Sequence, residues 1–205
     1  MSPFPLPTLL TAVLAWMTLV SPASASYLVG RPAMDPSRFA IAAKYNGLTY
    51  HPDGGENEER YKRSLDSRDF WVVQVGLEGD VDYALRDFLL FRFGSALYRD
   101  CADVWAGFFH LGFRLQWDPM DRLALRIGIG PTYLWRQNWL NRVKGYTKDS
   151  FFGDATKGPF QDAFIWYGGD IDVEWRAWRR VSLVYSMIPG YPEVIQSSAG
   201  VRMSF

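Results

Sequence analysis

Apolar and polar residues alternate strictly along the segment 105–117, which reads WAGFFHLGFRLQW. The odd positions form an apolar face that begins and ends with tryptophan, whereas the even positions carry small and polar groups. A period of two is the period of a β-strand. About twelve steps of 3.3 Å, tilted near 45°, span roughly 28 Å, which approaches the thickness of a membrane's hydrocarbon core. The pattern therefore predicts a strand that crosses a membrane, with its aromatic ends at the two interfaces.

The same alternation recurs in seven other segments of the chain. We predict these further strands at residues 39–50, 70–84, 88–99, 122–136, 163–176, 181–188 and 195–205. The turns after the second, fourth and sixth strands are short, whereas the loops 51–68 and 137–161 are long and polar. Short turns alternating with longer loops, and an even number of strands, are typical of outer-membrane barrels. The predicted fold class is all-β, an eight-stranded antiparallel up-and-down transmembrane β-barrel over residues 26–205.

The N-terminal segment has the features of a secretory signal. Residues 9–20 are apolar, and the small residues Ser21-Pro22-Ala23-Ser24-Ala25 follow them. This order predicts a signal peptide over residues 1–25, cleaved after Ala25. No lysine or arginine precedes Arg31, so the usual basic start is missing; an uncleaved anchor is the alternative, although twelve apolar residues are short for a span. Export combined with a barrel predicts the outer membrane of a Gram-negative bacterium as the location.

Composition narrows the function classes. The formal net charge is zero, so we expect no nucleic-acid partner. The chain has a single cysteine, Cys101, which excludes an internal disulfide and carries no metal-ligand spacing. We therefore predict no metal and no cofactor. Asp100 and Asp103 flank Cys101, and neighbouring carboxylates raise the pKa of a thiol and make it less reactive.

The polar face of the predicted strands carries many charged residues. An eight-stranded barrel has room for only a few large side chains inside, so we assign the aromatic face to the outside and the charged face to the lumen. A soluble lipocalin-like barrel, with the opposite parity, is the structural alternative. Buried charges need partners because an unpaired ion in a low-dielectric interior is very costly. We predict an interior ion network of Lys44, Glu78, Asp80, Asp82, Arg92, Arg114, Arg126, Asp170, Asp172, Glu174 and Arg202.

This ion network is expected to close the lumen. A tight turn at residues 85–87 would set Asp80 opposite Arg92. The alternative, a selectivity ring in an open pore, needs a wider barrel than eight strands supply.

The other half of the predicted interior is lined by small residues. Phe108, Tyr98 and Trp166 are the expected large fillers among them. Small residues allow close packing around such fillers, but they also suit a pocket for a ligand or an acyl chain, and both interpretations stay open. The small inward residues are Gly76, Gly94, Ala96, Ala106, Gly112, Gly128, Gly130, Thr132 and Gly168.

The last strand carries a family resemblance. Val201, Met203 and the terminal Phe205 alternate with Gly200 and smaller or polar residues. This ending resembles the C-terminal strand of outer-membrane barrels, which the outer-membrane assembly machinery recognises, and the architecture looks like the OmpA-type class of small barrels. The resemblance implies that this machinery, outer-membrane lipids and lipopolysaccharide are the partners.

Candidate catalytic residues are few. His110 and Ser186 are the candidates for a hydrolase or acyltransferase that modifies lipid A, because a serine nucleophile needs a base within hydrogen-bond reach. The segment around Ser186 faintly resembles the His-x-Ser-Asn pattern of lipid A deacylases, but Val184 and Met187 replace the histidine and the asparagine. A structural or surface-binding role is the preferred prediction, and the enzyme is the alternative.

The long loop 137–161 mixes cations with aromatic residues. Such a loop could contact lipopolysaccharide phosphates or a partner protein, and a solvated loop without a ligand is the alternative. The residues concerned are Trp139, Arg142, Lys144, Tyr146, Lys148 and Lys157.

Overall fold

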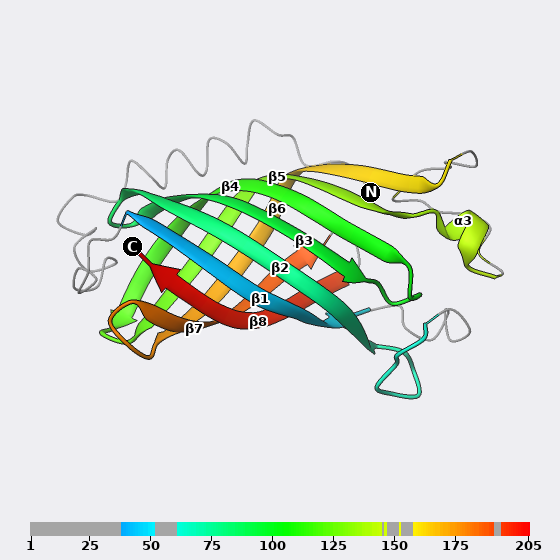
Figure 1. The fold of residues 1–205 in the computed structure, drawn as a ribbon, viewed down its shortest axis with the longest axis horizontal. Helices are drawn as coiled ribbons and strands as arrows, with labels where there is room; N and C mark the ends of the chain where they lie inside the picture. The colour runs from blue at the N-terminus through cyan, green and yellow to red at the C-terminus, as the bar shows by residue number, and fades with distance from the viewer. Residues whose placement is uncertain (1–37, 52–60, 145, 147–151, 153–157, 191–193) are drawn as a thin grey trace, which may run out of the picture.

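The chain folds into a closed barrel of eight strands. The computed structural model describes residues 38–51, 61–144, 146, 152, 158–190 and 194–205; the predicted signal peptide, Lys148 and Lys157 lie outside these residues. The C-terminus lies at one end of the barrel, and the short helix α3 (Trp139–Arg142) lies beyond the other end (Figure 1). No helix in the described part of the chain is long and apolar enough to span a membrane. The strands are β1 (Phe39–Tyr50), β2 (Trp71–Arg86), β3 (Leu89–Arg99), β4 (Trp105–Met120), β5 (Leu123–Gln137), β6 (Phe160–Arg176), β7 (Val181–Gly190) and β8 (Val194–Ser204).

Each strand pairs with its neighbours in the sequence, and β8 closes the barrel on β1. All eight ladders are antiparallel. At the closure, Ala42 pairs with Asp80 of β2 on one side and with Arg202 of β8 on the other. The predicted eight-stranded antiparallel up-and-down barrel is therefore confirmed.

Two predicted turns lie further along the chain than expected. The β2–β3 turn falls at Asp87 and Phe88, and β4 continues through the predicted 118–121 turn as far as Met120. In β4 the register shifts between Trp117 and Met120, so Pro119 occupies a bulge. A proline is tolerated there because no ladder hydrogen bond is required of it.

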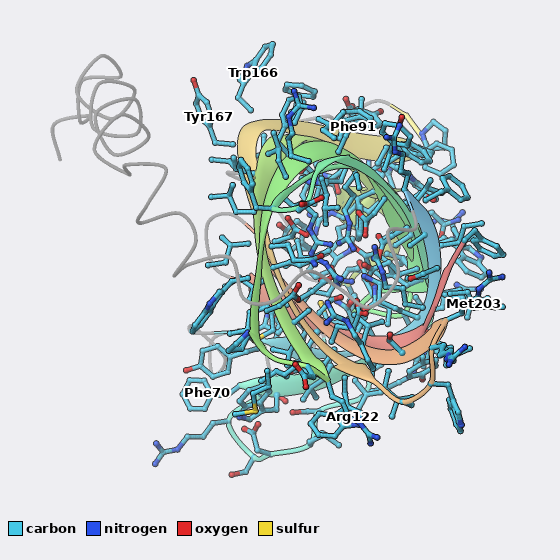
Figure 2. The ribbon with its side chains drawn as sticks, turned by 90° about the vertical axis from the view of Figure 1, so that its left-hand side faces the viewer. Phe70, Phe91, Arg122, Trp166, Tyr167 and Met203 are labelled. Carbon is cyan, nitrogen blue, oxygen red and sulfur yellow. The ribbon has the colours of Figure 1, made fainter. Side chains whose placement is uncertain are left out.

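Side chains alternate between the two faces of the wall as predicted. Leu77 is 72 % exposed and Ile127 is 64 % exposed, whereas Arg114 and Asp172 are fully buried. In the view along the barrel, nitrogen and oxygen atoms fill the inside of the ribbon, while Phe91 projects outside it (Figure 2). A lipocalin-like barrel would point its apolar face inward and its charged face outward, so this alternative is excluded.

The upper part of β6 departs from the prediction. Gly168 pairs with Gly130, but Ile165 pairs with Thr132, so β6 has one residue more than β5 across this bulge. One extra residue reverses the parity of every position beyond it. Ile165, which an unbroken alternation along β6 would place outward, therefore shares the inward face with buried Thr132. The prediction that Trp166 fills the lumen is wrong, because this side chain is 69 % exposed and points away from the barrel (Figure 2).

The other two predicted fillers are inside. Tyr98 and Phe108 are buried together with Ala96 and Ala106 in one cluster. A Cβ built at Gly76 would overlap Tyr98. Tyr98 thus occupies the space that a side chain at Gly76 would need, which favours close packing over an open pocket at this level.

Candidate functional site

The eleven charged residues assigned to the lumen are all buried, and none of their side chains is more than 4 % exposed. They come from every strand except β7, and the period of two places each of them on the inward face. Five cationic side chains meet six carboxylates, so the ionic charges nearly cancel. Near-cancellation is the condition under which a low-dielectric interior tolerates ions.

Arg92 of β3 lies at the centre of this network. Its guanidinium contacts Asp82 at 3.0 Å, Asp80 at 3.1 Å, and both Asp170 and Asp172 at 2.9 Å. The register sets Asp82 rather than Asp80 opposite Arg92, because the midpoint of the hairpin lies at Asp87 instead of Arg86, and a shift of one residue in the midpoint moves the cross-strand partner by two. The prediction that Asp80 lies opposite Arg92 is therefore wrong by two residues, although Asp80 Oδ2 still lies 3.1 Å from Arg92 Nη2.

Arg114 of β4 makes a second bridge across the lumen. Its Nη2 lies 2.6 Å from Asp170 and 2.8 Å from Asp172, and its Nη1 lies 3.5 Å from Asp82. Strands β4 and β6 have β5 between them, and β3 is farther still from β6. The two arginines thus connect walls that share no ladder, which ties the barrel together through its interior.

Towards the loop end, Lys44 continues the network. Its ammonium pairs with Glu78 and Asp80 and donates to Ser186 Oγ at 2.9 Å. Ser186 in turn donates to Asp172 Oδ1 at 2.6 Å. The hydroxyl of Ser186 therefore connects the Lys44 group to the central arginines.

Towards the turn end, Arg126 and Arg202 complete the network. Arg126 pairs with Glu174 and donates to Gln116 at 2.9 Å. Arg202 pairs with Asp82, and its Nε lies 3.3 Å from Glu174.

The two candidate catalytic residues do not form a pair. His110 Nδ1 is hydrogen-bonded to Thr132 Oγ1 at 2.8 Å, and Ser186 is held by Lys44 and Asp172. Among the described residues no hydrogen bond joins His110 to Ser186, and both are buried, at 5 % and 1 % exposed. A serine–histidine mechanism needs direct reach between base and nucleophile, so the geometry gives the enzyme alternative no support.

A second ordered region, which pattern reading missed, lies at the loop end. Cys101, Ala102 and Val104 of the β3–β4 loop pack with Val72 and Trp139 in a small hydrophobic cluster. We call this cluster the loop platform. The signal for it was present in the sequence as apolar residues within a short loop, but no periodicity reveals which distant segment covers them.

Asp100 holds the loop platform together. Its Oδ1 accepts from the backbone N–H groups of Ala102 and Val104, both at 3.0 Å, and its Oδ2 accepts from the Trp139 indole at 2.7 Å. Burial raises the pKa of Asp100 despite these hydrogen bonds. Burial, followed by the charge of Asp100, raises the pKa of the Cys101 thiol, in agreement with an unreactive cysteine. Trp139 is only 6 % exposed, so a solvated Trp139 is excluded.

His51 is a buried titratable group at the same end. Its ring centroid lies 4.6 Å from that of Tyr61, whose hydroxyl is hydrogen-bonded to Nδ1 at 3.2 Å. Burial lowers the pKa of His51 to about 4, against the opposing influence of Asp69. His51 is therefore neutral at pH 7.

Comparison with known proteins shows a likeness in fold. No family model matches the chain, and no curated protein matches it. Among solved structures, the neisserial surface protein NspA is 16 % identical with a TM-score of 0.51, and the match covers 82 % of this chain and 98 % of that one.

Two further structures are similar over the same share of this chain. Ail of Yersinia pestis, solved with the heparin analogue sucrose octasulfate, is 10 % identical with a TM-score of 0.48, covering 82 % of this chain and 97 % of Ail. The N-terminal β-barrel domain of Pseudomonas aeruginosa OprF is 14 % identical with a TM-score of 0.47, covering 82 % and 98 %. The likeness to NspA shows that the chain shares the fold of this small outer-membrane barrel.

Proposed function

We propose that this chain is a small bacterial outer-membrane barrel with a structural or surface-binding role, whose lumen is closed by its internal ion network. An outer wall of exposed leucine, isoleucine and aromatic side chains suits contact with lipid. The helix and the loop platform lie at the end with the longer loops, which is the extracellular end in barrels of this type.

The observation that carries the proposal is the pair of arginines that cross the lumen. Arg92 and Arg114 share Asp82 from β2 and, across the lumen, Asp170 and Asp172 from β6. Opening a path through this layer would separate buried ions, and the desolvation penalty of each unpaired ion is several kcal/mol. The ion network therefore closes the lumen with side chains of the barrel strands themselves.

The C-terminal strand supports the proposed partners. Val201, Met203 and Phe205 are 43, 47 and 56 % exposed on the outer face, and the Phe205 N–H donates to the Phe39 carbonyl at 2.8 Å. We propose that these three side chains are read by the assembly machinery during insertion and contact outer-membrane lipid afterwards.

Ion flux through liposomes tests the closed lumen. The purified, folded protein should give no conductance above that of protein-free vesicles. The double variant Arg92→Ala/Arg114→Ala, if it folds, should leak, whereas Arg122→Ala/Arg179→Ala, with changes outside the lumen network, should not. Steady conductance by the unaltered protein would contradict the proposal.

A further inference from the structure

A basic pocket lies at the extracellular end, beside the loop platform. It has a volume of about 580 Å³ and is formed where the chain before β2, the β3–β4 loop and α3 meet. Its lining includes the cationic side chains of Lys62, Arg63, Arg99 and Arg142 and one carboxylate, Asp103. Four cations against one carboxylate give this concave surface a clear excess of positive charge.

The single carboxylate of the pocket is already engaged. Asp103 forms an ion pair with Arg63, and its backbone carbonyl accepts from Arg99 Nη1 at 3.0 Å. Lys62 and Arg142 have exposed side chains. The pocket therefore offers cationic donors to an anion from more than one side.

Buried contacts fix the segments that line the pocket. Asp100 ties the β3–β4 loop to Trp139 at the start of α3, and the Lys62 N–H donates to the Cys101 carbonyl at 2.9 Å. Because these segments are held before any ligand arrives, less conformational entropy is lost on binding.

The pocket also lies at a defined depth. Arg99, the last residue of β3, pairs with Trp105, the first residue of β4, and its guanidinium carbon lies 4.2 Å from the Trp105 ring centroid. Outward aromatics at the strand ends mark the membrane interface of such barrels. Arg99 is therefore held at the level where lipid headgroups begin.

We propose that this pocket binds the phosphate groups of an outer-leaflet glycolipid. Guanidinium groups bind phosphate through paired, charge-assisted hydrogen bonds, and the depth of Arg99 favours a phosphate attached to a lipid. The inference rests on the proposed outer-membrane location and adds a ligand class and a site to the surface-binding role.

Native mass spectrometry of the full-length protein in detergent tests the pocket, with lipid A carrying two phosphates as the probe. The unaltered protein should bind this lipid at least about tenfold more tightly than dephosphorylated lipid A, and Arg99→Gln/Arg142→Gln should lose about tenfold in affinity. The matched control Arg68→Gln/Arg122→Gln removes two exposed cations that do not line the pocket and should stay within about twofold. Equal losses in both double variants would overturn the proposal.

A second variant gives a gain rather than a loss. Asp103 has a left-handed backbone, with φ 64°, which asparagine also adopts readily. Asp103→Asn should tighten lipid A binding several-fold because it removes the competing carboxylate and releases Arg63. Unchanged or weaker binding by a folded Asp103→Asn protein would count against the pocket.

Inorganic pyrophosphate separates the two sources of phosphate. It should displace lipid A only at concentrations far above those of the lipid; equal competition would overturn the lipid assignment in favour of a free anion. A protein that binds no lipid A but conducts no ions would contradict the pocket alone, whereas ion conductance would contradict the closed lumen regardless of lipid binding.

Discussion

The Trp139 indole N–H donates a 2.7 Å hydrogen bond to Asp100 Oδ2, and this bond joins the connection between β5 and β6 to the loop between β3 and β4. Both residues are buried, at 6 % and 5 % exposed. A hydrogen bond to a buried carboxylate is stronger than one between neutral groups. The segments at the loop end of the barrel are therefore held by a specific polar contact in addition to the hydrophobic cluster.

Trp139→Phe should loosen the loop platform while leaving the barrel intact. The substitution keeps an aromatic ring but leaves Asp100 Oδ2 without its donor, which costs about 1–3 kcal/mol. We expect faster proteolytic cleavage in the loops and an unchanged urea midpoint for the barrel. Trp178→Phe, at a side chain that is 71 % exposed, is the control and should match the unaltered protein. Equal protease resistance in all three proteins would show that this bond does not hold the loops.

Arg92→Leu should strongly destabilise the barrel. It removes one cation from among four carboxylates, and breaking a buried ionic group by removing one partner costs about 3–5 kcal/mol. Urea unfolding in lipid vesicles measures the loss. Arg176→Leu is the matched control, because its side chain is 20 % exposed and pairs with Asp118 near the rim; we expect about 1 kcal/mol or less there. Similar losses of unfolding free energy in the two variants would contradict the central position of Arg92 in the ion network.

Gly128→Ala should be costly, and Gly79→Ala should not. A Cβ at Gly128 would overlap the Asp170 carboxylate and crowd Arg114, whereas a Cβ at Gly79 would meet only the Ala42 carbonyl oxygen at 3.8 Å. Overpacking typically costs 1–3 kcal/mol, while alanine in an unobstructed strand position is neutral or favourable by about 0.5–1 kcal/mol. The two urea midpoints should therefore shift in opposite directions or differ clearly in size. Equal shifts would contradict the packing of the lumen around Asp170.

The loops around His51 should loosen as the pH falls. Burial lowers the pKa of His51 from 6.5 to about 4, so the opened state binds a proton before the closed state does. The free energy that favours the packed loops over the opened loops is therefore unaffected above about pH 6.5 and falls between pH 6.5 and pH 4. By pH 4 this free energy has decreased by on the order of 3 kcal/mol. Protease sensitivity of the loops at pH 7 and at pH 4.5 measures this change.

His51→Gln is the control for that pH series. Glutamine stays neutral throughout the range, so the loss of protection between pH 7 and pH 4.5 should shrink in the variant. An identical pH dependence in the two proteins would assign the effect to other groups.

The amino-acid sequence by itself determined the strand count, the order of the strands and the face on which the side chains lie, except beyond the bulge in β6. The period of two is local and has to be obeyed wherever one face meets lipid. For this reason the set of inward charges, such as Lys44 and Arg114, could be read without a structure.

Only the tertiary structure decided which of these charges meet. Arg92 contacts Asp170 across the lumen because the barrel closes with a particular stagger, and stagger depends on turns and bulges whose effects add up around the wall. The bulge in β6 turned Trp166 outward for the same reason. The loop platform and its basic pocket also required the fold, since Asp100 and Trp139 are brought together by packing between loops, which follows no period along the chain.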